Sequence, residues 1–381
     1  MTTLDRYIAR QFLVNVVVLL TILFLFVIAI DVAINLGRFA EAGASLSASD
    51  DPGVLGRAWL TAYAVCDLWW PRLVQLYGFL LGLVMVAALG FTATQLARSR
   101  ELLAMVAAGQ SLHRVARPVL IVAGGLTLLQ AGAQELVLPR VAPLLSRDHG
   151  DAGKRFGSAA PIPLVATDDG VLLSAAAFDA ELGVLERPFF FEVDERGRST
   201  QVVRAERATW SEPDGAWVLE NGYAESRLAA GTAGDRPAPV AKNRVQTSLD
   251  PARLRFERDA AYRQALGFAQ ARSMLENAGG IGEQTKDGLR RIMWGRVSVM
   301  ACNILSLLIA MPFFVTRQPD GIMPRVLRGT PLALTALMGG ILGSSAAIPG
   351  LENGWLATLG VFLPVLVLAP LAAAALGAIK T

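Results

Sequence analysis

The sequence predicts an α-helical membrane protein with six transmembrane helices, three on each side of an antiparallel β-domain that lies in water. Its 381 residues are 53% hydrophobic and only 18% charged, with a mean hydropathy of +0.45, and soluble domains are rarely so apolar. Six apolar runs are long enough to cross about 30 Å of hydrocarbon as helices. Most of the charged side chains, 43 of them, lie between Pro139 and Arg291, so we expect this segment to face water.

The six predicted spans flank the charged segment symmetrically. They are Phe12–Leu36, Leu73–Leu96, Pro118–Leu138, Ile292–Val315, Pro331–Ile348 and Trp355–Ile379. The first run follows Arg6 and Arg10 and superficially resembles a signal peptide. It is too long for the apolar region of a signal peptide and has no convincing cleavage site, so we expect a retained span.

Basic residues in the short loops predict the orientation. If the N-terminus lies inside, only three basic residues fall in the short outer segments, Arg38, Arg57 and Arg72. Ten fall in the inner segments: Arg6, Arg10, Arg98, Arg100, Arg114, Arg117, Arg317, Arg325, Arg328 and Lys380. Lys and Arg favour the cytoplasmic side, so we expect both termini in the cytoplasm and the β-domain outside.

The segment between the first two spans, from Gly37 to Arg72, contains helix breakers at Asp50–Gly53. Four aromatic residues follow: Trp59, Tyr63, Trp69 and Trp70. Indole and phenol rings favour the headgroup layer of a bilayer. The segment therefore predicts an interfacial helix or an aromatic belt.

A charged, amphipathic segment separates the second and third spans, at about residues 98–110. Its apolar residues include Leu102, Leu103 and Met105, and its charged residues cluster at the two ends. This pattern predicts a short helix along a membrane surface, which Gly109 ends. In membrane proteins, a helix of this kind is a binding site for a soluble partner.

The water-facing block reads as short strands in PLVAT, VLLSAAAF, PFFFEVD, TQVVRAERATW and AWVLENGYAESRL. Turn signals such as Asp214-Gly215 and Asn221-Gly222 separate them. This spacing predicts an antiparallel sandwich or jellyroll. A helical pattern follows from about residue 260 and ends at Gly279-Gly280. We therefore divide the chain into residues 1–138 (spans one to three), 139–259 (β-jellyroll), 260–291 (helical connector) and 292–381 (spans four to six).

The sequence contains no motif for catalysis, a cofactor or a metal. It lacks GxxxxGK[ST], HExxH, GxSxG and paired-cysteine motifs, and it has only two histidines. Cys66 and Cys302 lie in or beside apolar segments without metal-ligand neighbours, so we interpret both as small apolar residues. We expect a non-enzymatic chain.

Polar residues inside spans are costly in lipid and gather here toward the outer ends. They are Asp31, Asn35, Arg72, Gln75, Gln130, Gln134 and Glu135. They predict either a polar cavity for the headgroup of an amphiphile or interface-level side chains that reach water. Arg38, just outside the first span, either meets a lipid phosphate or anchors the helix. Asp31, Arg38, Arg72 and Glu135 are thus the candidate lipid-binding residues.

The run from Arg98 to Gly109, RSRELLAMVAAG, closely resembles the cytoplasmic coupling segment of the lipopolysaccharide-export permeases of the LptF/LptG family. The N-terminal LDRYIARQFL, the tryptophan-containing stretches AERATW and WVLENG, and Met311-Pro312-Phe313 agree with that family. The resemblance covers nearly the whole chain.

The resemblance implies a permease subunit of an ATP-driven ABC exporter in the inner membrane, with a periplasmic jellyroll. Two such permeases would pair, bind two copies of a soluble cytoplasmic ATPase, and pass lipopolysaccharide or a similar amphiphile to a periplasmic jellyroll bridge protein. It also implies that Glu101 sits in a groove of the ATPase, with Arg98 and Arg100 nearby, and that Arg38 faces lipid phosphates. The coupling residues would be Arg98, Arg100, Glu101, Leu102, Met105 and Gly109.

Two alternatives stay open at this point. A secondary transporter would need ion-coupling carboxylates near mid-bilayer, whereas Asp31 and Glu135 lie toward the outer end. A scaffold without transport activity would use the spans merely to anchor the β-domain.

Overall fold

The computed structural model describes residues 3–46, 53–145, 147–153, 160–166, 170–179, 182–193, 199–226, 238–258, 265–276, 283–314 and 355–378, with a few positions between 329 and 342. Within these residues, five helices are long and apolar enough to cross a membrane. They confirm a helical membrane protein. The predicted fifth span, Pro331–Ile348, lies mostly outside the described residues, so a count of six is not confirmed.

The helices of the bundle exceed the predicted spans at several ends. Their bounds are α1 Thr3–Ser45, α2 Gly53–Arg98, α3 Glu101–Ala107, α4 Leu112–Gly132, a π-helix Ala133–Val137, α5 Leu138–Leu145, α9 Glu283–Phe314 and α11 Trp355–Ala378. Hydropathy marks where a helix is apolar, but the backbone stays helical beyond that point. Most of the segment Gly37–Arg72 is therefore helix, belonging to the end of α1 and the start of α2.

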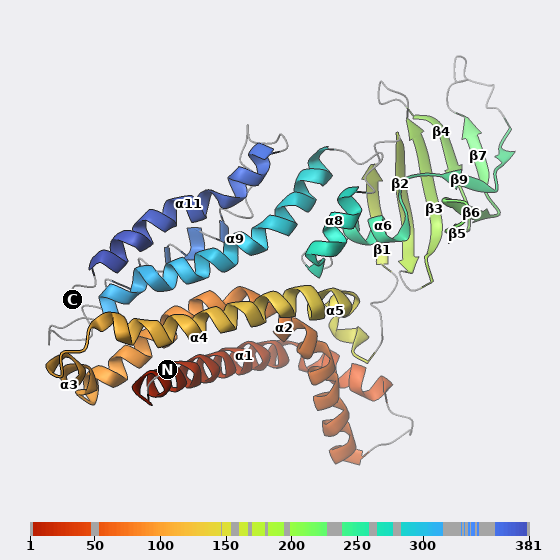
Figure 1. Ribbon diagram of the computed structural model, residues 1–381. Coiled ribbons are helices and arrows are strands. Elements are labelled where there is room, and N and C mark those ends of the chain that lie inside the picture. Colours follow the sequence, from red (N-terminus) through yellow and green to blue (C-terminus); the bar gives the residue numbers. More distant parts are fainter. Residues whose placement is uncertain are drawn as a thin grey trace.

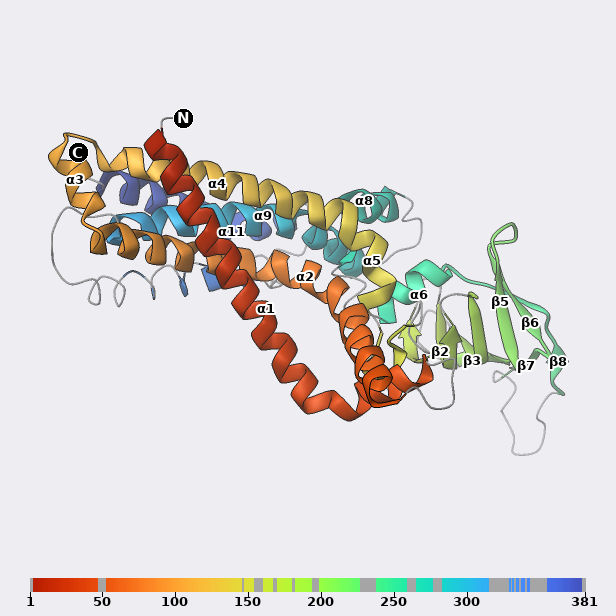
Figure 2. The same cartoon turned by 90° about the horizontal axis from the view of Figure 1, so that it is seen from below.

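Helices α2, α4, α9 and α11 run in nearly the same direction, and α1 crosses them obliquely in Figure 2. The β-domain lies at one end of the bundle, and both termini and α3 lie at the other (Figures 1 and 2). One core joins the N-terminal part of α1 to α2, α3, α4 and the end of α9. Helix α2 approaches α9 closely, because a Cβ on Gly82 would lie 2.1 Å from Asn303 Oδ1. Small residues at such crossings permit close packing in membranes.

Nine antiparallel strands form one curled sheet in the described part of the β-domain. They are β1 Ala160–Ala166, β2 Val171–Asp179, β3 Val184–Val193, β4 Ser199–Arg204, β5 Arg207–Ser211, β6 Ala216–Glu220, β7 Tyr223–Ser226, β8 Val240–Ala241 and β9 Arg244–Gln246. The stretches predicted as strands match β1 to β7. The predicted turn at Asp214-Gly215 is present, with Gly215 at φ +55°.

Strand β3 is the centre of the sheet. One of its edges pairs with β2 from Val184 to Glu192, and the other edge is shared by β5 and β4. The division falls at Arg187, which has φ +47° and donates its N–H to Glu206 O over 2.8 Å. The sheet thus splits into a branch β4–β7–β8 and a branch β5–β6–β9, which produces the curl.

Large side chains fill the β-domain. Phe178, Phe190 and Trp217 are fully buried in one cluster, and Trp217 Nε1 donates to Leu249 O over 2.8 Å. Three short helices connect this domain to the bundle: the 3₁₀ turn His149–Asp151, α6 Pro251–Arg258 and α8 Phe268–Glu276. Helix α8 falls within the predicted connector, whereas Gly279-Gly280 lies outside the described residues.

Candidate functional site

The short helix α3 lies at the end of the bundle that carries the termini (Figure 1). Helix α2 ends at Arg98, and Arg100 turns the chain with φ +59° before α3 begins at Glu101. Gly109 has φ +75°, and the Gln110 N–H donates to Met105 O over 3.0 Å. This is the glycine C-cap in which a left-handed residue closes the last turn. The predicted end of the helix at Gly109 is confirmed.

The two faces of α3 differ in exposure. Leu102 and Met105 are buried in the bundle core, so these two predicted coupling residues point inward. Leu103 is 62% exposed, and Ala104, Ala107 and Ala108 are exposed beside it. The outward face of α3 therefore consists of alanine side chains around one exposed leucine. The exposed Arg98 and Arg100 come just before this helix in the chain. Such a face suits a groove in another protein.

Polar contacts tie this end of the bundle to the start of α1. The Tyr7 hydroxyl donates to Glu101 Oε1 over 3.2 Å, and Arg114 Nε lies 3.8 Å from Asp5 Oδ1. Further along, the Asn15 side chain donates to Thr92 Oγ1 and to Gln95 Oε1. A force on α3 would therefore reach α1 directly. The sequence did not indicate these contacts, because their partners lie 77 to 109 residues apart.

At the opposite end of the bundle, Asp31 is held by protein partners. Its carboxylate accepts hydrogen bonds from Trp69 Nε1 at 2.9 Å and from Asn35 Nδ2 at 2.8 Å, and His149 Nε2 lies 3.0 Å away. His149 also packs edge-on against Phe39. Asp31 therefore joins α1, α2 and the 3₁₀ turn.

Arg72 belongs to the same junction. Its Nη2 donates to Arg147 O over 2.9 Å, and its guanidinium lies 5.8 Å from the centre of the Trp69 ring. The side chain of Arg147 is 1% exposed and pairs with Asp67, with 2.6 Å between Nη1 and Oδ2. Asp67 also accepts from the Gly153 N–H. The Arg147 guanidinium and the Asp67 carboxylate thus fix the chain just after the end of α5, where it leaves the bundle.

Arg38 is exposed beside this junction. The pKa of Asp148 lies below its usual range, mainly because its carboxylate accepts a hydrogen bond from the His149 N–H, with a smaller contribution from the charge of Arg38. Arg38 is therefore close enough to act on Asp148. Of the four predicted lipid-binding residues, Arg38 and Glu135 are exposed, whereas Asp31 and Arg72 are half-buried.

Glu135 lies in the π-helix, and its carboxylate caps α8. Both carboxylate oxygens accept from the Phe268 N–H, at 3.0 and 2.8 Å, and Oε1 lies 3.6 Å from Arg296 Nη1. A carboxylate at a helix N-terminus satisfies donors that the helix itself leaves unpaired. Asp31, Arg72 and Glu135 are thus brought to the same end of the bundle, each with partners inside the chain.

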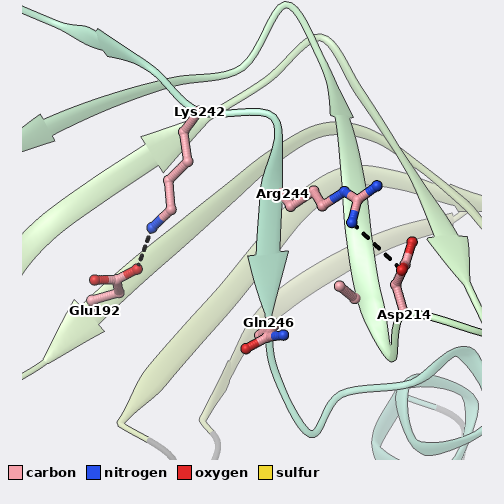
Figure 3. Close-up of a pocket in the computed structure, with 6 residues that line it drawn as sticks. Glu192, Asp214, Lys242, Arg244 and Gln246 are labelled. Carbon is pink, nitrogen blue, oxygen red and sulfur yellow. Dashed lines mark hydrogen bonds and ion pairs between the residues drawn. The ribbon is translucent and has the colours of Figure 1, made fainter.

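A cavity of about 410 Å³ on the β-domain was not predicted. Figure 3 shows its charged lining, in which Lys242 Nζ lies 2.7 Å from Glu192 Oε1 and Arg244 Nη1 lies 3.5 Å from Asp214 Oδ1. On β9 the exposed Arg244 and Gln246 alternate with the buried Val245. This alternation is the sequence signal that places the two polar side chains on the same outer face of the strand. Because both cations are paired, the lining is polar but locally neutral.

A bundle of long apolar helices with an inserted antiparallel β-domain, and with a short, partly exposed helix at the far end, defines the class of multi-pass membrane proteins with an extramembrane β-domain. The sequence profile of the family described as lipopolysaccharide export system permease LptF/LptG matches residues 64–377. The chain belongs to this family. None of the curated proteins compared with the chain matches it.

Family membership establishes the chain as a permease of the lipopolysaccharide export system and a non-catalytic transmembrane subunit of an ABC transporter. It decides against the secondary transporter and the passive scaffold. The chain is a multi-pass membrane protein of an export complex.

Proposed function

We propose that this permease works in the inner membrane as a six-span subunit, with the termini and α3 in the cytoplasm and the β-domain in the periplasm. It would extract lipopolysaccharide and pass it to a periplasmic jellyroll bridge protein. Its proposed partners are a soluble ATPase dimer and a second homologous permease. The basic residues near α3 support this orientation, since Lys and Arg favour cytoplasmic loops. The division at residues 138, 259 and 291 is part of the proposal.

The observation that carries the mechanism is the link between α3 and α1. The outward face around Leu103 would dock in the ATPase, while Leu102 and Met105 anchor the helix in the bundle core. Movement of the ATPase would then turn α3 and α1 together through the Tyr7–Glu101 contact. This is rigid-body coupling between two distinct sites.

The lipid residues take different roles in this proposal. Arg38, exposed at the outer end of α1, is the candidate contact for a lipid phosphate. Asp31, Arg72 and Glu135 would act as positioning residues, because their side chains are engaged at the junctions with the β-domain. They would keep the outer end of the bundle and the β-domain in a fixed relative position during transport.

The test is charge reversal at Glu101. Glu101→Lys should abolish ATPase-dependent release of lipopolysaccharide from proteoliposomes and weaken capture of the ATPase, while thermal stability in detergent stays near the wild-type value. Glu276→Lys, an exposed carboxylate on α8 at the other end of the bundle, is the matched control. Wild-type release by Glu101→Lys would contradict the proposed coupling.

The partners are tested by purifying the tagged chain from native membranes in mild detergent and identifying co-purified proteins by mass spectrometry. We expect a soluble P-loop ATPase and a second permease of this family. Recovery of the stable chain alone would count against the proposed assembly.

A further inference from the structure

The first part of α2 points away from the bundle. In Figure 1 its N-terminal half projects downward, roughly across the direction of the other long helices, and in Figure 2 the same part is seen almost end-on. We define residues 53–70 as the α2 arm; Pro71 follows it inside the helix. The arm lies at the end of the bundle that carries the β-domain.

One face of the α2 arm is an exposed apolar stripe. Leu55 is 88% exposed, Trp59 73%, Tyr63 53% and Trp70 43%, and Cys66 is exposed between the last two. These positions are spaced by three or four residues, so they lie on one side of the helix. Arg57 is two residues from both Leu55 and Trp59 and therefore lies on the opposite side.

The end of α1 fixes the direction of the stripe. Gly43 packs against the backbone of the arm, since a Cβ there would lie 2.9 Å from Thr61 N, and Ala42 and Ala64 are buried in one cluster. Ala64 and Leu68 lie on the side of the helix opposite the stripe. In both views the last turns of α1 lie on the β-domain side of the arm (Figures 1 and 2). The stripe therefore faces back toward the level of the spans.

The depth of the arm follows from α1. The exposed apolar residues of α1 run from Leu13 to Leu36, about 35 Å of helix, which is enough to cross the hydrocarbon. Gly43 lies seven residues beyond Leu36, past Asn35, where φ −112° and ψ 20° break the helix and turn its axis. At a rise of 1.5 Å per residue, Gly43 is therefore at most about 10 Å beyond the last of these residues. The arm lies on the membrane side of Gly43, so its stripe lies within about 10 Å of the hydrocarbon edge. That is the headgroup layer.

We propose that the α2 arm is an interfacial anchor that rests on the leaflet nearest the β-domain and takes phospholipid headgroups and the adjoining glycerol region along its stripe. Trp and Tyr favour this layer, and a helix with one aromatic face lies in the plane of the interface. Because Gly43 and Thr61 join the arm to α1, the anchor would hold the outer end of α1 at a fixed depth. The anchor is independent of the ATPase and of the lipid exported.

Cys66 provides a natural probe within the stripe. The full-length Cys302→Ala variant would carry a nitroxide spin label on Cys66 and be reconstituted into vesicles of phosphatidylethanolamine and phosphatidylglycerol. Collision rates with oxygen, which concentrates in lipid, and with a water-soluble nickel chelate would give its depth. The control is a label on Arg57→Cys, in a chain that also carries Cys66→Ala and Cys302→Ala.

We expect oxygen to dominate at position 66 and nickel to dominate at position 57. Replacing both Leu55 and Trp59 by Ser should remove the oxygen preference at position 66, because the arm would lift from the surface. Nickel dominance at both positions would overturn the proposal by placing the arm in water. Protection of position 66 from both reagents would also overturn it, since a protein surface would then cover the stripe.

Discussion

At the scale of single residues, the partners of Asp31, Arg72 and Glu135 show what the sequence leaves open about polar groups inside spans. Asp31, Arg72 and Glu135 were predicted as lipid ligands because polar groups are costly in lipid. Their positions toward one end of the spans could be predicted from the sequence. Their partners could not, since His149 lies 118 residues from Asp31 and Phe268 lies 133 residues from Glu135. Only the fold decides whether a polar group meets a ligand or another part of the chain.

Arg147→Met should be the most damaging change at the junction between the bundle and the β-domain. It leaves the Asp67 carboxylate without its guanidinium, and removing one partner of a buried ion pair costs about 3–5 kcal/mol. Since Asp67 is 21% exposed and keeps the Gly153 N–H, we expect the lower end of that range. Thermal unfolding in detergent would measure the loss. Arg272→Met, which breaks the exposed pair with Glu276, should leave the transition unchanged; an equal effect of both variants would contradict this account.

At the scale of elements, α3 could be predicted most completely. Its charged ends, its apolar residues and Gly109 gave a short surface helix with a defined stop, because each of these signals is local. Which apolar residues face outward was not predictable. The answer depends on the turn at Arg100, where a positive φ sets the direction of the helix and buries Leu102 and Met105. Leu103 is therefore the large exposed side chain on the outward face of α3, among the residues that the structure describes.

Gly109→Ala should impair coupling more than stability. A left-handed conformation costs an L-residue about 1–2 kcal/mol, so the cap of α3 would loosen or the helix would run on. We expect reduced capture of the ATPase and slower lipopolysaccharide release, with a melting temperature close to wild type.

The matched control is Gly124→Ala, inside α4, where an added Cβ meets no described atom within 4 Å. There the substitution should be neutral or slightly stabilising, because alanine favours helix interiors over glycine. Unimpaired coupling in Gly109→Ala would show that the cap is not needed for docking.

At the scale of the whole molecule, hydropathy and charge separated the bundle from the β-domain. The strands followed from β-rich segments between turn residues, and the structure confirms an antiparallel sheet. The division of β3 between two neighbours could not be predicted. It depends on one backbone position, Arg187, and on pairing between segments far apart in the chain. The length of α1 and α2 beyond the spans was likewise not visible in hydropathy.

The β-domain has its own core, so its stability should be separable from that of the bundle. Trp217→Ala should destabilise it by about 3–5 kcal/mol, since the indole is fully buried and bonded to Leu249 O. Amide hydrogen exchange should accelerate in β1 to β9 and remain slow in α2 and α9. Trp210→Ala, which removes a partly buried ring at the same place, should have a smaller effect. Equal loss of protection in α2 would contradict two separate cores.

The close packing of Gly82 against Asn303 has a consequence for how the protein is made. Helix α2 leaves the ribosome long before α9, because the whole β-domain is encoded between Arg98 and Glu283. At synthesis rates of about 5–20 residues per second, the first helices wait roughly 10–40 s for this partner. The Gln130 side-chain N–H can already donate to Gly78 O meanwhile, since both lie in the first half of the chain. The N-terminal half can thus persist in the membrane as a biosynthetic intermediate while the β-domain is being synthesised.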